Sequence, residues 1–353
     1  MQTEFLIIGQ GISGTFLSWY LQQEKKEFIV IDNHFENAPS RIAAGIINPV
    51  TGRRMVKTWM IDDLLPNAEK AYTELGKQLG IAAISKKRIL DFFPTPQMRD
   101  VFMQHIENKD HYFQPFPEEN DFTQFFHYNF GCGEIHPAYT VHLETVLPAW
   151  RKILIKNRQL LQEDFDISHL SVEKNQLAYK EIKAEKIIFC DGISSTNHPW
   201  FQLLPFARNK GEALVLEIPE LSKEYIYKKG YTLAPLADQD LFWLGSSYQW
   251  AFTDARPSKE FFDAATSFLR SWLKMPFRVL DHKAAIRPAT LERRPFVGFH
   301  PLHPQIGILN GMGTKGCSLA PFFAKQLTVH LLHQTPILPE AAVNRFRKIL
   351  QRS

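Results

Sequence analysis

The chain has 353 residues, of which 44% are hydrophobic and 22% are charged, a composition typical of a soluble globular protein with two domains. Its 41 basic and 37 acidic residues leave a net charge of +4, which is too small to favour a nucleic-acid partner. No apolar run approaches the roughly 18 residues that a membrane span requires. Membrane-spanning and strongly nucleic-acid-binding classes are therefore not expected.

The N-terminus and the cysteines both favour the cytoplasm. The first Lys or Arg is Lys25, so the N-terminus lacks the positive region of a signal peptide. Cys132, Cys190 and Cys317 lie far apart without CxxC spacing, and the histidines show no HxxxH or HExxH spacing. We expect a cytoplasmic protein without disulfides, zinc or another metal site.

The first thirty residues predict a βαβ unit. Apolar runs predict strands at Glu4–Ile8 and Phe28–Ile31, and helical periodicity predicts a helix over Ile12–Gln23. Such a unit with a glycine turn after its first strand is the setting in which a dinucleotide binds.

Gly9, Gly11 and Gly14 form a GxGxxG pattern between this strand and helix. The three glycines would allow a tight turn, close approach of the backbone to a pyrophosphate, and close packing of the helix on the sheet. Asp32 ends the second strand, where its carboxylate can accept hydrogen bonds from an adenosine ribose and disfavours the 2′-phosphate of NADP. The pattern predicts a dinucleotide site, but FAD and NAD share it.

The chain continues with a small-residue segment, "SRIAAGIINPVTGRR" (Ser40–Arg54), whose backbone could approach a flat ligand closely. Later segments predict helices at Asp62–Leu79 and within 140–157, a strand within 184–195, and strands in "YTLAPL" and "LFWLGSSY" (231–248). Nucleotide-binding units at the start, centre and end, separated by β-rich segments, predict one discontinuous nucleotide-binding domain and one inserted domain.

A second glycine turn, "NGMGTKG" (310–316), lies between a predicted strand and helix within 305–332. If both helix N-termini converge on one cofactor, the first would serve pyrophosphate and the second another electron-rich group. The N1/C2=O edge of a flavin becomes negative on reduction and fits this position. The alternative for either turn is a packing role only.

Arg287 ends the apolar run "AAIRP" and precedes a proline, which disfavours helical geometry, so we expect it extended at a strand end. A guanidinium drawn inward needs an anion or several acceptors. A ligand anion and a structural partner are both compatible with this segment alone.

The order of these motifs resembles the D-amino-acid oxidase superfamily of FAD-dependent oxidoreductases over nearly the whole chain. The motifs are GxGxxG, Asp32, "SRIAAGIINP", "KIIFCDG", "RNKGEALVLE", "YTLAP", "FWLGSSY", "IRPATLERRPFVG" and "ILNGMGTKGCSLAP". Glycine oxidase, the sarcosine oxidases and the flavin domain of an enzyme that trims a carboxymethyl group on a tRNA wobble uridine are similar. The resemblance implies an α/β fold with a discontinuous Rossmann-like FAD-binding domain (1–85, 136–205 and 281–353) and an inserted, mostly antiparallel β substrate domain (86–135 and 206–280).

The resemblance also implies noncovalent FAD, because "RPATL" has Ala289 where the sarcosine oxidases carry the cysteine that binds flavin. The residues implied to contact FAD are Gly9, Gly11, Ile12, Ser13, Gly14, Asp32, Asn33, Ser40, Arg41, Ala44, Gly45, Gly192, Gly311, Gly313, Thr314, Lys315 and Gly316.

The implied reaction is oxidation of a carboxylate-bearing amine or amino acid by hydride transfer to flavin N5, followed by imine hydrolysis and reoxidation by O2 or another acceptor. No side-chain base is implied. Arg287 would hold the substrate carboxylate, with Tyr231 as its second contact and Tyr248 as a weaker candidate.

Two alternatives stay open: action on a modified tRNA uridine, and a flavoprotein that binds a ligand without turnover. The cationic residues Arg53, Arg54 and Lys57 are not typical of enzymes for simple neutral amino acids, and they could equally be exposed loop charges.

Overall fold

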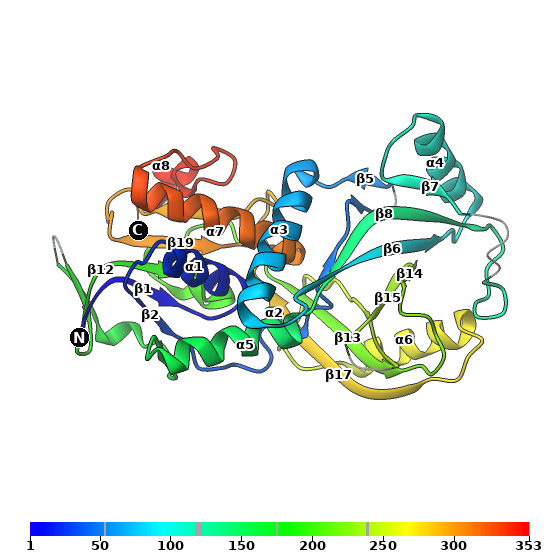
Figure 1. The fold of residues 1–353 in the computed structure, drawn as a ribbon, viewed down its shortest axis with the longest axis horizontal. Coiled ribbons are helices and arrows are strands. Elements are labelled where there is room, and N and C mark those ends of the chain that lie inside the picture. Colours follow the sequence, from blue (N-terminus) through cyan, green and yellow to red (C-terminus); the bar gives the residue numbers. More distant parts are fainter. Residues whose placement is uncertain (53, 117–121, 174–175, 238–239, 353) are drawn as a thin grey trace.

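A computed structural model describes residues 1–52, 54–116, 122–173, 176–237 and 240–352. The molecule is elongated, with one large sheet in each half, and both termini lie in the same half (Figure 1). One half combines parallel strands with helices, and the other holds a mostly antiparallel sheet, which confirms the expected α/β class with an inserted β-rich part.

The half with the termini is built on an eight-stranded sheet. Its strand order is β10 (Leu170–Val172), β11 (Leu177–Tyr179), β12 (Ile182–Phe189), β1 (Gln2–Ile8), β2 (Phe28–Ile31) and β9 (Leu160–Leu161), with β19 (Ile306–Asn310) beside β12 and β18 (Phe296–Phe299) beside β19. The strands β12, β1, β2, β9 and β19 are parallel to their neighbours in this group. The FIVI run of β2 is buried throughout, as expected of a parallel strand covered on both faces.

Helices cover this sheet and place two helix N-termini near each other. α1 (Ile12–Gln23) and α7 (Gly316–His333) pack side by side (Figure 1). α5 (Leu143–Lys156) is fixed to α1 by a hydrogen bond from Trp150 Nε1 to Ser18 Oγ, and α3 (Ile61–Leu79) is fixed to α7 by one from the Tyr72 hydroxyl to the Cys317 carbonyl. The predicted βαβ unit and the predicted helices are thus confirmed.

The second sheet has nine strands. Its order is β17 (Arg278–Arg287), β13 (Asn209–Glu217), β16 (Leu241–Gly245), β15 (Tyr231–Pro235), β14 (Tyr225–Lys229), β6 (Ile84–Phe92), β8 (Cys132–Val141) and β3 (Ile46–Ile47), with β7 (Phe113–Pro115) beside β8. Only β14 and β6 pair in parallel. The apolar side of α6 (Lys259–Trp272) covers one face of this sheet, where it packs against buried leucines and phenylalanines of β13 and β16.

Short elements complete the chain. They are α2 (Pro39–Ile42), β4 (Val50–Thr51), β5 (Val56–Lys57), α4 (Pro96–Glu107), the 3-10 turns η1 (Ile167–His169), η2 (Gly192–Asn197), η3 (Gly313–Lys315) and η4 (Val343–Phe346), and α8 (Arg347–Leu350). Residues 84–85 and 136–141 pair within the nine-stranded sheet, and the division of the chain into residue ranges for two domains remains a prediction.

No helix in the described part of the chain is both long and apolar enough to cross a membrane. The three cysteines are free, and the described residues contain no cluster of His, Cys, Asp and Glu that could hold a metal.

Candidate functional site

The first glycine turn is closely packed at two of its three glycines. A Cβ on Gly9, whose φ is +96°, would lie 2.7 Å from the Cys190 carbonyl oxygen, and one on Gly14 would lie 1.9 Å from the Gly9 carbonyl oxygen. A Cβ on Gly11 would instead meet only the side chain of Ser40, with Oγ at 3.2 Å. Gly9 and Gly14 therefore serve the turn and the helix packing, while Gly11 opens towards α2.

The N-terminus of α1 faces α2. The backbone N–H of Ile12 donates to Ser40 Oγ at 3.1 Å, and Ser13 is buried in the first turn. Arg41 follows Ser40, so a cation and a hydroxyl both stand beside the positive end of the helix. An anion such as a pyrophosphate is favoured at this position.

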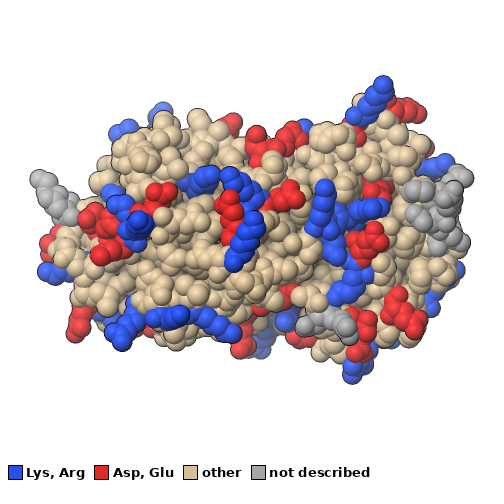
Figure 2. Space-filling view, in the orientation of Figure 1, with Lys and Arg blue, Asp and Glu red and all other residues tan. Residues whose placement is uncertain are grey.

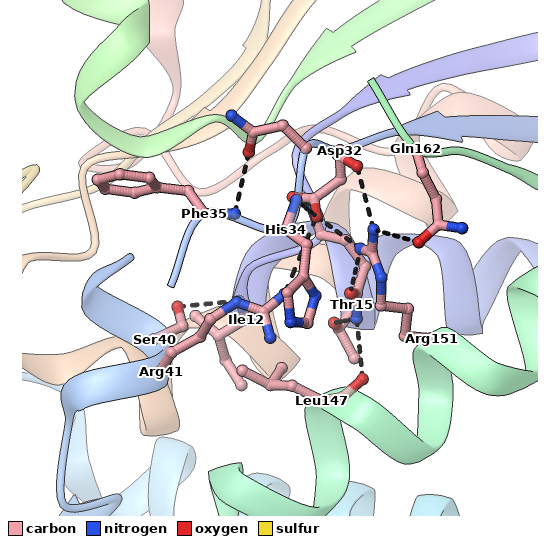
Figure 3. Close-up of polar contacts among 12 residues, drawn as sticks. Ile12, Thr15, Asp32, His34, Phe35, Ser40, Arg41, Leu147, Arg151 and Gln162 are labelled. Atoms are coloured by element: carbon pink, nitrogen blue, oxygen red, sulfur yellow. Dashed lines mark hydrogen bonds and ion pairs between the residues drawn. The ribbon is translucent and has the colours of Figure 1, made fainter. Parts of the chain in front are cut away.

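Asp32 is the centre of a polar cluster at the end of β2 (Figure 3). Its Oδ2 accepts from the Gln10 backbone N–H at 2.8 Å, and its Oδ1 accepts from Arg151 Nη1 at 2.6 Å and from the His34 backbone N–H at 2.9 Å. Arg41 Nη2 is 3.9 Å from the same Oδ1. Two arginines facing one carboxylate leave this end of the turn with a surplus positive charge.

Arg151 belongs to the candidate site and was missed by sequence reasoning. It is only 4% exposed, and its guanidinium also donates to the Asp32 carbonyl, to Gln10 Oε1 and to Gln162 Oε1. It therefore joins α5 to the ends of β1, β2 and β9. Burial, followed by the charges of Arg41 and Arg151, lowers the pKa of His34.

Asn33 does not face this cluster. Its side chain contacts Asp164 and accepts a hydrogen bond from the Phe35 backbone N–H. The described structure therefore gives Asn33 a loop-stabilising role, and its predicted contact with FAD remains a prediction.

The second glycine turn lies against the first. A Cβ on Gly316, at the start of α7, would be 3.3 Å from Ile12 Cγ2 at the start of α1. Gly311 and Gly313 have φ of +79° and +56° and pack beside Thr290 and Ala289. The two helix N-termini therefore lie close together, which meets the condition for serving a single shared cofactor.

Lys315 leaves this turn with a partly buried side chain that points to Thr58. Its Nζ donates to Thr58 Oγ1 at 3.1 Å, and it forms no ion pair with an acid among the described residues. Burial, with repulsion from Arg293 and Arg294, lowers the pKa of Lys315 to about 8. An anion placed here would be stabilised by three cations.

Other residues of the implied FAD set have mixed surroundings. Gly45 has φ of +72°, and a Cβ there would lie 1.9 Å from the Val141 carbonyl oxygen, so its close approach is to β8. Gly192 has φ of +61° with only Pro288 within 4.0 Å of a Cβ. Ala44 is buried, and Thr314 is exposed at the second turn.

Arg287 ends β17 in extended geometry, as predicted. Its Nη1 donates to Asn209 Oδ1 at 2.6 Å and to the Ser247 carbonyl at 3.3 Å, and the guanidinium lies over Gly211, where a Cβ would be 1.8 Å from Nη2. Burial lowers its pKa, and no carboxylate of the described residues forms an ion pair with it. Its charge is therefore met by neutral acceptors alone.

The structure brings Tyr248 to Arg287 but not Tyr231. The guanidinium carbon lies 5.7 Å from the centre of the Tyr248 ring, a cation–π contact, and Tyr248 is 48% exposed. Tyr231 packs against Phe261 and Phe268 of α6, on the opposite face of the sheet from Arg287. Tyr231 therefore cannot share a ligand with Arg287 in this structure.

The cationic segment after β4 is only partly described. Arg53 lies outside the described residues, and Arg54 is exposed. Lys57 forms an ion pair with Asp62 and lies 5.9 Å from the centre of the Tyr112 ring. Lys57 thus has a structural partner, while the role of Arg53 and Arg54 stays open.

Comparison with known proteins decides the family. The FAD dependent oxidoreductase family (DAO) matches residues 4–329. The chain belongs to this family. FAD is therefore its cofactor. The described residues fit an adenine dinucleotide: the two glycine turns lie together and Gly11 is open towards α2. The hydroxyl of Ser40 and the positive charge of Arg41 suit an anionic pyrophosphate.

Solved structures of this family share the fold. Iminodiacetate oxidase from Chelativorans sp. BNC1 is 16% identical with a TM-score of 0.75, covering 96% of this chain and 98% of that one. Glycine oxidase from Bacillus cereus is 14% identical with a TM-score of 0.74, covering 95% and 96%. L-proline dehydrogenase from P. horikoshii is 14% identical with a TM-score of 0.75, covering 99% and 98%.

Proposed function

We propose that this FAD-dependent oxidoreductase oxidises a primary or secondary amine that carries a carboxylate. The observation that supports the proposal best is Arg287, a mostly buried guanidinium whose described partners are all neutral. A carboxylate matches its two-pronged geometry and would supply the missing negative charge. The names of the glycine oxidase, iminodiacetate oxidase and proline dehydrogenase relatives all describe carboxylated amines.

The chain's own residues would bind and orient the substrate. Arg287 would hold the carboxylate, Asn209 would fix the guanidinium, and Tyr248 would cover it from the exposed side. When bound, FAD supplies the redox chemistry by accepting a hydride from the α-carbon, and the resulting imine hydrolyses in water. Fixing the carboxylate fixes the α-carbon, which is the contribution of the protein to this step.

Lys315 would stabilise negative charge at the second glycine turn. Its ammonium and the N-terminus of α7 both lie at this turn, which supports the expectation that the N1/C2=O edge of the flavin would bind there. The electron acceptor after substrate oxidation, O2 or another compound, is part of the same proposal and is not assigned further.

Anaerobic addition of carboxylated amines to the purified yellow protein tests this proposal. A substrate should bleach the flavin absorbance. A change in band shape without bleaching for every amine tested would favour the ligand-binding alternative and contradict the proposed oxidation. Heat or acid should release intact FAD, because Ala289 stands in place of a flavin-linking cysteine; flavin that stays on the denatured chain would contradict noncovalent binding.

Action on tRNA gains no support from the structure. On the face drawn in Figure 2, Lys and Arg are interspersed with Asp and Glu on a surface that is mostly uncharged. Tight binding of tRNA needs many Lys and Arg residues that contact phosphates and whose charge is not cancelled by nearby acidic residues.

A further inference from the structure

The face of the nine-stranded sheet opposite α6 carries more of the proposed substrate site than Arg287. Gly211 and Ala213 of β13 share one face because side chains alternate along a strand. Ala213 pairs directly with Gly245 of β16, so Gly245 and its second neighbour Trp243 lie on this same face. The side chains of Phe242 and Leu244, on either side of Trp243 in the strand, point to the α6 side.

Two glycines on this face are each covered by a large side chain. A Cβ on Gly211 would lie 1.8 Å from Arg287 Nη2, and a Cβ on Gly245 would lie 2.5 Å from Trp243 Cη2. Gly211 is the diagonal neighbour of Gly245 across β13 and β16, a spacing of about 7–8 Å. The guanidinium and the indole therefore lie a short distance apart, above the small residues Gly211, Ala213 and Gly245.

The indole of Trp243 is held in one orientation. Its Nε1–H donates to the Ile42 carbonyl at 2.9 Å, at the end of α2, the helix that carries Ser40 and Arg41 beside the first glycine turn. The side chain is only partly buried, so part of the apolar ring remains accessible. Turning the indole away would break this hydrogen bond, so the ring is held in place and forms a rigid wall of the proposed substrate site.

We infer that Trp243 is the residue that limits substrate size. This inference rests on the proposed amine oxidation: with the carboxylate on Arg287, the indole stands where a long substituent on the α-carbon or nitrogen would extend. The structure thus assigns the enzyme to small carboxylated amines, of the size of glycine, N-methylglycine or alanine. Each methylene that the wall excludes changes kcat/KM by about 10- to 200-fold.

The test compares Trp243→Leu with Phe242→Leu in the FAD-loaded enzyme. Rates of anaerobic flavin reduction are measured with glycine, N-methylglycine and both enantiomers of alanine, norvaline and phenylalanine. Trp243→Leu should raise kcat/KM for norvaline relative to glycine at least tenfold. Phe242→Leu removes an aromatic ring from the same strand but from the α6 face, so it should leave this ratio within twofold of the wild type.

Two further measurements test the inference even if the leucine variant does not fold. Trp243→Phe keeps an aromatic wall without the hydrogen bond to Ile42 and covers the case in which the leucine variant does not fold; it should show an intermediate ratio. Unreactive carboxylates from acetate to hexanoate, followed by perturbation of the flavin spectrum, should bind in inverse order of length to the wild type only. An unchanged ratio in both Trp243 variants, or a wild type that prefers phenylalanine, would contradict the role of Trp243 in limiting substrate size and leave the proposed amine oxidation intact. A wild type that reacts with no amine would overturn the proposed function and the inference with it.

Discussion

Arg151 and Arg287 are two mostly buried arginines in opposite surroundings. Arg151 meets the carboxylate of Asp32 at 2.6 Å and three further acceptors, all within the eight-stranded-sheet half of the molecule. Arg287 meets an amide oxygen and a backbone carbonyl, with no carboxylate among the described residues. Removing one partner of a buried ion pair leaves an unpaired charge and destabilises the fold, whereas a cation that has only neutral partners can bind an anionic ligand. The same residue type thus supports the predicted dinucleotide site at Arg151 and is proposed to bind the substrate at Arg287.

Replacing Arg151 is the most severe test of this difference between the two arginines. Arg151→Met leaves Asp32 buried without its main counter-charge, and we expect the free energy of unfolding to fall by about 3–5 kcal/mol. Urea denaturation of the FAD-free and FAD-loaded protein measures this change. FAD should also bind more weakly, because Asp32 and Arg41 lose their common partner.

The double variant Arg151→Met with Asp32→Asn is the control for this prediction. It removes both charges of the 2.6 Å pair and should recover only part of the lost stability, since the carboxylate that lacked its main partner is gone but Arg41 loses its more distant contact with that carboxylate. A single Arg151→Met variant as stable as the wild type would show that Arg151 contributes nothing to the fold.

Replacing Arg287 should lower activity and leave stability unchanged, the opposite of what we expect at Arg151. Arg287→Ala removes the proposed carboxylate partner and should lower kcat/KM by roughly 30-fold to several thousandfold, equivalent to about 2–5 kcal/mol. FAD content and the urea midpoint should stay near those of the wild type, because no described carboxylate loses a partner. Steady-state kinetics and the flavin-to-protein absorbance ratio measure these effects.

Arg287→Lys is the matched variant. It keeps the charge without the planar fork, so it should recover only part of the activity. Loss of FAD or of the folded state in Arg287→Ala would instead make this arginine structural.

The local part of the fold could be predicted from the sequence, and the long-range contacts could not. Gly9, Gly11 and Gly14 lie where an apolar strand leads into a helix, so their roles follow from spacing alone. The Arg151–Asp32 pair joins residues 119 positions apart, and no motif marks it. Tyr231 shows a different limit: a shift of one residue along a strand changes the face of the sheet, and a motif match does not reveal the face.

Signals for the remaining site residues were present but ambiguous. Asn209 and Gly211 lie in "RNKGEALVLE", which indicates only the family resemblance, and Trp243 lies in "LFWLGSSY", which predicts a strand but not which face of the sheet the indole covers. Which glycine lies beneath which side chain depends on the pairing of β13 with β16 and β17, and only the folded chain supplies that pairing.

Lys315 is, like Arg287, a cation without a carboxylate partner among the described residues, and it should make the stability of the protein depend on pH. Burial lowers its pKa to about 8 in the folded protein, against about 10.4 in an unfolded chain. Between these values the unfolded state binds more protons, so the stability of the FAD-free protein should rise as the pH increases from about 8 to 10. The gain is at most about 3 kcal/mol, and solvent screening reduces it. Urea denaturation across this range should show the rise in the wild type and not in Lys315→Met; parallel pH profiles would contradict the shifted pKa.

The smallest expected effect is on the flavin itself. Lys315→Met removes a cation from the start of α7, where the reduced, negatively charged edge of the flavin is predicted to lie, but the helix N-terminus, Arg293 and Arg294 remain. We therefore expect the midpoint potential to fall by about 20 mV, which corresponds to about 1 kcal/mol for a two-electron couple. The affinity for sulfite should fall in parallel, since its flavin adduct is also anionic. Redox titration with a reference dye measures the potential, and Arg54→Met, an exposed cation of the loop after β4, is the control that should leave it unchanged. Equal potentials in the wild type and Lys315→Met would place the ammonium away from the flavin edge, and the convergence of the two glycine turns would then serve packing rather than charge.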